Sequence, residues 1–218
     1  MPKIGGKENV MKTVTNRILK VLLGGVIFFL GFALDTQATA QSLPNGGFET
    51  GNLSGWTSGS INNGSVSVVT EGTCWSSFDT RGITMPGVYA ANVRSSGPAP
   101  TDSVGILTSN SFVASKGVSF YALSERSSPL QANPVNFVVN ILAVPSGNII
   151  STQIVGTNLI TISQFCNAGP VGPNWIFSNH SIDTSAVFGQ NIQIEFRQNT
   201  NISGLGFFTL VDRVRRIP

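Results

Sequence analysis

The sequence predicts an all-β protein built from two packed antiparallel sheets. Apolar residues alternate with polar ones in short segments that recur about every ten to twenty residues, and no segment carries a sustained apolar stripe of helical period. The clearest case is residues 191–198, where Ile192, Ile194 and Phe196 share one face. The composition points the same way, because 24 glycines and only 11% charged residues accompany short runs of Val, Ile and Phe.

The first 40 residues are predicted to be a removable signal peptide. Lys12, Arg17 and Lys20 precede the apolar run Val21–Leu34, and the small residues Ala38, Thr39 and Ala40 follow it. We expect cleavage after Ala40, which leaves residues 41–218 as one domain that is secreted to the periplasm or the extracellular space. The alternative is a membrane anchor, but this run has only 14 residues and contains three glycines, short of the roughly 20 that cross a bilayer.

Removing this leader leaves a neutral chain. Five of the 13 Lys and Arg residues lie before Gln41 but only two of the ten acidic residues do, so eight of each remain. A protein that binds nucleic acid usually shows a basic patch or stripe, and this balance does not indicate one. We expect no nucleic-acid partner and no stable membrane span after cleavage, and the oligomeric state stays open.

Ten segments after the leader are predicted as strands, because each is a short alternating or β-branched run between turn residues. Residues 136–144 are apolar on both faces apart from Asn136 and Asn140, which predicts a strand covered on both sides. The connections carry Gly, Pro, Asn and Ser, as in Pro145–Asn148. The predicted strands are Val66–Val69, Val88–Val93, Val104–Leu107, Ser111–Val113, Val118–Leu123, Asn136–Val144, Ile149–Val155, Trp175–Ile182, Ile192–Gln198 and Phe207–Arg215.

Both cysteines follow the leader and lie in the two least regular loops. Cys74 falls within residues 72–86 and Cys166 within residues 158–174. Two thiols in an exported protein most simply form one disulfide, so we predict a bridge between Cys74 and Cys166. Two buried free thiols are the alternative. A metal site is a poorer explanation, because the chain has no C-x-x-C pair and His180 is its only histidine.

The segment Leu43–Thr57, LPNGGFETGNLSGWT, opens the domain with a dense set of turn signals. Residues 45–47 can take positive φ, Phe48 supplies an apolar anchor, and two further glycines turn the chain before Trp56. This segment resembles the opening motif, N-G-G-F-E followed by G-x-L-x-G-W, of bacterial secreted jelly rolls of the galactose-binding-like and carbohydrate-binding-module type.

The end of the chain also resembles this family. It reads FFTLVDRVRR where similar jelly rolls commonly end L-D-D-V, so Asp212 matches the first acid and Arg213 replaces the second. The resemblance implies a two-sheet antiparallel jelly-roll β-sandwich whose opening and closing segments lie together. With the alternation, it predicts a core that contains Phe48, Trp56, Phe120, Phe137, Ile141, Trp175, Ile194, Phe196 and Leu210.

The sequence offers few candidate catalytic residues, so we expect that the protein is not an enzyme. A glycosidase needs two carboxylates that flank one bond, and a hydrolase triad needs a nucleophile, a histidine and an orienting acid. The eight acidic residues after the leader are scattered singly. His180 lies in a strand pattern, where a lone histidine is more often structural than a general base.

The resemblance implies carbohydrate binding by aromatic faces and amides on a sheet or at loop tips, with a polysaccharide or another glycan as the partner. We predict sugar contacts from Trp75, Phe78, Asp79, Tyr89 and Tyr121. The alternative for Trp75 is a lid over the edge of the sandwich. The alternative for the protein is a structural or adhesive role in the cell envelope or outside the cell, without a small-molecule ligand.

The resemblance also implies a structural calcium ion. Similar jelly rolls hold it between the opening segment and the last strand, which here gives Glu49, Asp212 and the backbone carbonyls of residues 45–47 as ligands. Such hard oxygen ligands suit calcium, which takes six to eight of them.

The alternation in the last strand gives a separate reason to expect a partner for Asp212. A period of two places Asp212 in one row with Phe208, Leu210 and Val214, and a carboxylate in an apolar row must be neutralised. A calcium ion is one solution. The alternative is an ion pair with Arg81, Arg94 or Arg213.

Overall fold

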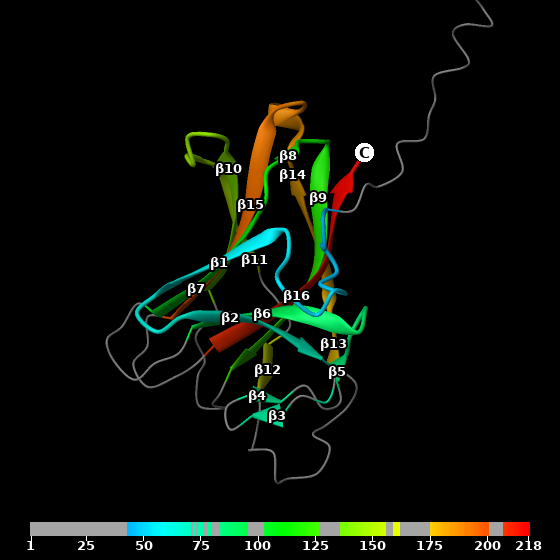
Figure 1. The fold of residues 1–218 in the computed structure, drawn as a ribbon, viewed down its shortest axis with the longest axis vertical. Helices are drawn as coiled ribbons and strands as arrows, with labels where there is room; N and C mark the ends of the chain where they lie inside the picture. The colour runs from blue at the N-terminus through cyan, green and yellow to red at the C-terminus, as the bar shows by residue number, and fades with distance from the viewer. Residues whose placement is uncertain are drawn as a thin grey trace, which may run out of the picture. The chain divides into compact units, whose positions relative to one another are not determined.

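The computed structural model describes residues 43–70, 72, 74–75, 78–79, 83–95, 103–126, 136–155, 159–161, 175–200 and 207–218 (Figure 1). These residues form sixteen strands and one short 3-10 helix, η1 (Ser185–Val187). No helix in these ranges is long and apolar enough to cross a membrane. The prediction of an all-β fold is confirmed.

The first sheet contains six strands, and every pairing in it is antiparallel. Five of them follow the order β1-β7-β15-β10-β11, and β8 pairs with β15 beside them. The strands are β1 (Trp56–Ile61), β7 (Ser103–Ser109), β8 (Phe112–Val113), β10 (Asn136–Ala143), β11 (Ile149–Val155) and β15 (Asn191–Thr200).

The second sheet also contains six strands, in the order β12-β9-β16-β6-β2, and β14 pairs with β9. All of its pairings are antiparallel except β12 with β9. Two small pairs lie outside the sheets: β3 with β4, antiparallel, and β5 with β13, parallel. The remaining bounds are β2 (Ser65–Thr70), β3 (Cys74–Trp75), β4 (Phe78–Asp79), β5 (Ile83–Thr84), β6 (Tyr89–Ser95), β9 (Gly117–Arg126), β12 (Leu159–Thr161), β13 (Trp175–Ile176), β14 (Ser178–Asp183) and β16 (Phe207–Ile217).

Each of the ten predicted strands overlaps an observed one. The predicted strand 175–182 is divided at Phe177 into β13 and β14. Strand β10 lies between β15 and β11, and even its outer-face residues Asn140 and Leu142 are buried, which agrees with the expected cover on both sides. Strand β1 was not predicted, because its sequence WTSGSI has a single buried side chain, Trp56, and no apolar alternation. All six of its residues pair with β7, and this pairing holds the strand in the sheet.

The main core lies between the two sheets. Phe196 on β15 is its centre: the ring centroids of Trp56, Phe120 and Phe137 lie 6.0, 5.1 and 5.9 Å from that of Phe196. These aromatic residues come from both sheets, so their packing joins the two layers of the sandwich. Buried residues of the predicted core are Phe48, Trp56, Phe120, Phe137, Ile141, Ile194, Phe196 and Leu210, and the side chain of Trp175 lies outside the described ones.

A second, smaller core lies on the opposite face of the second sheet. Phe208 and Leu210 on β16 pack there with Leu123 of β9 and Phe177. Their neighbour Val211 packs in the main core, as the alternation of a strand requires. Leu210 is therefore buried as predicted, but outside the layer between the sheets.

A β-bulge interrupts β16 after Asp212. Asp212 pairs with Tyr121 of β9 and Arg215 pairs with Ser119, so three steps along β16 match two steps along β9. Arg213 takes the unusual φ of 48°. Val214 was expected to share a face with Phe208, Leu210 and Asp212, and this expectation is wrong. The extra residue of the bulge turns the side chain of Val214 into the main core instead.

Candidate functional site

The opening segment forms a loop that is bound to the end of β16. The amide of Val214 donates a hydrogen bond to the carbonyl of Gly46 at 2.7 Å. The indole Nε1 of Trp56 donates to the carbonyl of Asn45 at 3.2 Å, and the fully buried ring of Phe48 lies 5.3 Å from that of Trp56. The two ends of the domain lie together, as the resemblance implied.

The first two glycines of this loop do not take the positive φ that was expected of them. Positive φ occurs at Asn45 and Phe48, whereas Gly46 and Gly47 do not take it. Gly46 is instead required by close packing, since a Cβ there would lie 2.2 Å from the backbone oxygen of Val214. The two later glycines, Gly51 and Gly55, do take the expected positive φ.

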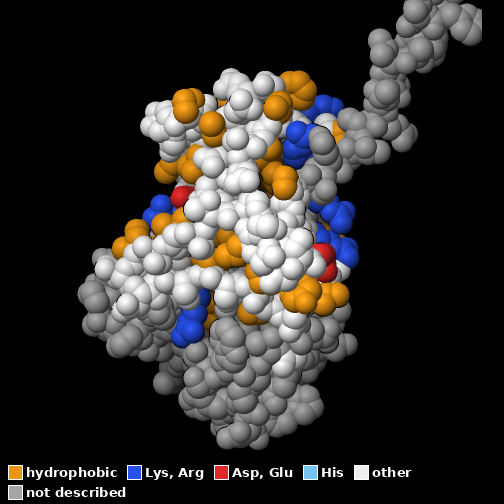
Figure 2. All heavy atoms as spheres, viewed as in Figure 1, with side chains coloured by type: hydrophobic (Ala, Val, Ile, Leu, Met, Phe, Trp, Pro, Cys, Tyr) orange, Lys and Arg blue, Asp and Glu red, His pale blue; other side chains and the backbone are white. Residues whose placement is uncertain are grey.

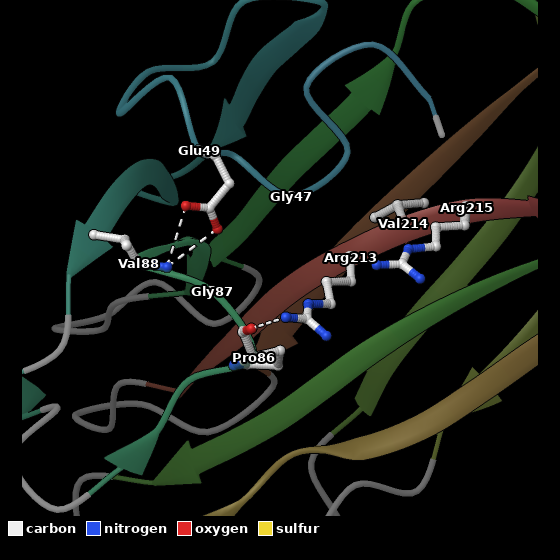
Figure 3. Close-up of a pocket in the computed structure, with 8 residues that line it drawn as sticks. All are labelled: Gly47, Glu49, Pro86, Gly87, Val88, Arg213, Val214 and Arg215. Atoms are coloured by element: carbon white, nitrogen blue, oxygen red, sulfur yellow. Dashed lines mark hydrogen bonds between the residues drawn. The ribbon is translucent and has the colours of Figure 1, made fainter. Parts of the chain in front are cut away.

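A pocket of about 430 Å³ lies beside this junction (Figure 3). Three segments meet there: the opening loop, the turn before β6 and the end of β16. Figure 3 shows Glu49 reaching from the loop toward the backbone of Val88, while Arg213 and Arg215 project from β16. The lining residues are Gly47, Glu49, Pro86, Gly87, Val88, Arg213, Val214 and Arg215.

Glu49 holds the turn before β6. Its two carboxylate oxygens accept a hydrogen bond from the amide of Val88 at 3.1 and 3.2 Å. A Cβ at Gly87 would lie 1.8 Å from Oε1 of Glu49, so only glycine leaves room for the carboxylate in this position. The glutamate therefore couples the opening loop to the start of β6.

Asp212 is fully buried next to this pocket, beneath Gly47. Its Oδ1 accepts the amide of Arg213 at 2.6 Å, and its Oδ2 has no hydrogen-bond partner. The pKa of the carboxyl is raised to about 7, first by burial and second by the negative charge of Glu49. The backbone amides of Arg213 and Gly87 and the charge of Arg213 act in the opposite direction. Asp212 is thus a buried acid with one oxygen still available to a proton or a cation.

Among the described side chains, the charge of Arg213 lowers the pKa of Asp212, but no ion pair joins Asp212 to an arginine. The guanidinium of Arg213 donates to the carbonyl of Pro86, and Asp212 forms no ion pair with it or with Arg94. Arg81, the third candidate, lies outside the described residues.

The donor set for a cation is small. In the described part of the chain, no group of three or more His, Cys, Asp and Glu residues could hold a metal ion. The carbonyls of Asn45 and Gly46 already accept hydrogen bonds from Phe48, Trp56 and Val214. The remaining oxygen ligands of the predicted set are Oδ2 of Asp212, the carboxylate of Glu49 and the carbonyl of Gly47, which suit a hard cation that keeps several waters.

Three of the five residues predicted to contact sugar lie in one hairpin. Trp75 pairs with Phe78, and Cys74 pairs with Asp79, between strands β3 and β4. The other two lie apart: Tyr89 at the start of β6 packs against the main core, and Tyr121 on β9 packs against the second core. The structure therefore brings Trp75, Phe78 and Asp79 together, and places the two tyrosines on opposite faces of the second sheet.

Two further sequence expectations concern Cys166 and His180. Cys166 lies outside the described residues, so its bridge to Cys74 remains a prediction. His180 on β14 stacks on Phe120 with ring centroids 5.5 Å apart, and burial lowers its pKa. Its Nε2 is buried without a partner, an arrangement that suits a packing residue.

Sequence reasoning missed the residues that complete the pocket. Pro86, Gly87 and Val88 lie far from residue 49 in the chain and carry no motif; the Pro-Gly pair signalled only a turn. Arg215 reaches the pocket because of the bulge, which alternation could not predict. On the face seen in Figure 2, Lys and Arg side chains occur in small separate groups among polar and apolar ones, so this face shows no basic stripe.

Comparisons with known proteins found similar solved structures. No family model and no curated protein match the sequence. Among solved structures, the K3 adhesin domain of Lys-gingipain from Porphyromonas gingivalis W83 is similar over 80% of this chain and 97% of its own, with a TM-score of 0.51 and 11% identity. TmCBM61, solved with β-1,4-galactotriose, is similar over 81% of this chain and 97% of its own, with a TM-score of 0.48 and 19% identity. At 11% identity, the likeness to the K3 adhesin domain shows a shared fold alone.

Proposed function

We propose that this chain is an exported, non-catalytic β-sandwich that binds a glycan in the manner of a carbohydrate-binding module. The observation that carries the proposal is the hairpin β3–β4, whose register places Trp75 opposite Phe78 and Cys74 opposite Asp79. Aromatic rings supply stacking area for the apolar face of a sugar, and a carboxylate accepts hydrogen bonds from its hydroxyl groups. The register makes Trp75 and Phe78 one cross-strand pair, and Asp79 follows at the next pair along the hairpin.

A structural role explains the carboxylates of the pocket better than a catalytic role does. Glu49 is held by the amide of Val88, and Asp212 is fully buried behind Gly47. A glycosidase acid and base must both reach the scissile bond of a substrate. The pocket carboxylates therefore serve the joint between the opening loop and β16.

Replacing Trp75 with alanine is expected to weaken glycan binding by about fivefold or more, because the loss of one stacked ring removes roughly 1 kcal/mol or more. A glycan array identifies the sugar, and calorimetry or retention on that polysaccharide measures the affinity. The matched control is Phe188→Ala, which removes an exposed aromatic ring elsewhere and should leave the affinity unchanged. Equal binding by the Trp75 variant, or an array without any selective signal, would refute the proposal.

We further propose that a structural calcium ion lies between Glu49 and Asp212. The support is the buried Oδ2 of Asp212 without a partner, together with the mutual repulsion of two neighbouring carboxylates. A divalent cation would satisfy both conditions, and Glu49 would bring the opening loop and the turn before β6 to the same ion. Bound calcium would supply charge neutralisation at the joint between the two ends of the domain.

The raised pKa of Asp212 gives this proposal a signature in the pH dependence of stability. A carboxyl whose pKa rises from 3.8 unfolded to about 7 folded binds more protons in the folded state between these values. Without calcium, its contribution to stability is therefore greatest below about pH 4 and is lost, by a few kcal/mol, as the pH rises to about 7. Calcium binds the ionised form and should remove this loss.

Thermal and urea melts from pH 4 to pH 8, in chelator and in calcium, test this prediction. Asp212→Asn should abolish both the pH slope and the calcium response, whereas Asp183→Asn, which removes an exposed carboxylate elsewhere, should keep both. If calcium leaves the melting point of the wild type unchanged at pH 8, the metal proposal is wrong. A slope that persists in Asp212→Asn would show that another group titrates.

A further inference from the structure

Two arginines of β16, Arg213 and Arg215, line the pocket beside the opening loop. Val214 lies between them in the chain and packs in the main core, so the strand directs both of its neighbours outward. Figure 3 shows the two guanidinium groups leaving β16 on the same side in that view. The end of β16 therefore brings two positive charges to one pocket.

Both guanidinium groups keep hydrogen-bond donors that no described residue uses. A guanidinium carries five N–H donors in a planar fork. Arg213 donates to the carbonyl of Pro86. Arg215 is exposed, and within the described part of the chain it forms no hydrogen bond and no ion pair. These donors can bind an anion, and their planar arrangement matches a carboxylate.

The charge of the pocket also favours an anion. Glu49 is the acidic residue among the described ones that line it. Asp212 is buried behind Gly47, and its pKa is raised to about 7, first by burial, so this carboxyl is mostly uncharged at about pH 6. Two arginines then face one glutamate, which leaves one positive charge in excess. A calcium ion at Glu49 and Asp212 would cancel both carboxylates and would leave the pocket positive as well.

The remaining walls of the pocket suit a hydroxylated ring. Val88, which is 62% exposed, and Pro86 offer apolar surface. The carboxylate of Glu49 accepts the amide of Val88, and its two oxygens keep further lone pairs for hydroxyl groups. The volume of about 430 Å³ lies within the range of roughly 300 to 1,000 Å³ that is usual for small-molecule sites. A sugar acid combines the carboxylate, the hydroxyl groups and the apolar ring face that these walls would recognise.

We propose that this pocket binds a sugar acid of the hexuronate class, with the carboxylate of the ligand held by Arg213 and Arg215. Hydroxyl groups of the sugar donate to Glu49, and one face of its ring lies on Val88. No residue of the hairpin β3–β4 lines the pocket, so this site is separate from the proposed glycan site and does not depend on it.

Titration of the isotope-labelled protein with glucuronate and with galacturonate, followed by NMR at about pH 6, tests the site. At least one of the two should shift the amide signals of Gly87, Val88 and Val214, which line the pocket. Glucose and galactose lack the carboxylate, and acetate and inorganic phosphate lack the ring, so all four should bind at least about tenfold more weakly. The proposal is overturned if neither uronate shifts these signals at tens of millimolar, or if a neutral sugar or a simple anion binds equally well.

Arg215→Gln tests the contact with the carboxylate. The side chain is exposed, so its replacement should leave the fold intact, which circular dichroism checks. The dissociation constant of the uronate should rise at least about tenfold, because charge-assisted hydrogen bonds are lost. The matched control is Arg94→Gln, which removes the same charge near the opposite end of β6 from Val88 and should change the constant by less than about twofold. Unchanged affinity in Arg215→Gln, or an equal loss in both variants, contradicts the proposal.

Trp75→Ala distinguishes this site from the hairpin. The amide shifts that the uronate causes at Gly87 and Val88 should persist in this variant, because Trp75 does not line the pocket. Their disappearance would mean that the uronate binds through the hairpin, and the separate site would be wrong. Equal glycan binding by wild type and Trp75→Ala would refute the glycan proposal alone, since the uronate shifts are measured independently.

Discussion

Replacing Phe196 with alanine is expected to lower the free energy of unfolding by about 3 to 5 kcal/mol. The ring is fully buried at the centre of the main core. It stacks on Phe137, lies edge-on to Phe120 and contacts Trp56. Phe120 belongs to the second sheet and the other three rings to the first sheet, so the cavity would open between the two layers of the sandwich. The rigid backbones of both sheets limit how far the cavity can collapse.

Urea unfolding of the purified protein, followed by tryptophan fluorescence and circular dichroism, measures this loss. Phe188→Ala is the control, because its ring is 66% exposed and its removal should change stability by less than about 0.5 kcal/mol. A loss below about 1 kcal/mol for Phe196→Ala would mean that the ring does not join the sheets as described.

The strands could be predicted from the sequence where burial alternates, and could not where pairing alone holds a strand. Residues 191–198 form β15 because one row of side chains faces the core, and that row is visible in the sequence. Strand β1 has only Trp56 to bury, and its place depends on β7, a long-range partner that periodicity does not report.

The site was partly predictable for a similar reason. Glu49 and Asp212 were identified through the resemblance of the two ends of the chain, and the structure places them near each other. The turn at Pro86–Val88 could not be assigned, because only the folded chain brings it to residue 49. The bulge could not be predicted from the sequence either. Arg213 takes a positive φ, which a glycine or an asparagine at this position would have suggested but an arginine does not.

Gly46 and Gly47 in the opening loop do not have the role that the sequence suggested. Positive φ was expected at residues 45–47, but the loop uses it at Asn45 and Phe48. Gly46 is instead a contact residue that lets the loop backbone meet the backbone of β16. This distinction changes the expected consequence of mutation, because a clash with another segment is not relieved by local φ and ψ adjustment.

Gly46→Ala is therefore expected to destabilise the domain by about 2 to 4 kcal/mol. The new Cβ would lie 2.2 Å from the carbonyl oxygen of Val214 and 3.2 Å from that of Leu43, and both are backbone atoms that no side-chain rotation can move. Relief requires the loop to retreat from β16, which breaks the 2.7 Å hydrogen bond from the Val214 amide to Gly46.

Gly59→Ala in β1 is the matched control for Gly46→Ala. Its nearest neighbour would be Cβ of Ile106 at 3.5 Å, an ordinary contact, so this change should be neutral or should stabilise by up to about 1 kcal/mol. Urea melts of the two variants side by side measure the difference. The calcium response should fall together with stability in Gly46→Ala, because the displaced loop carries Glu49 away from Asp212. Equal stability of the two variants would show that the opening loop does not need its close contact with β16.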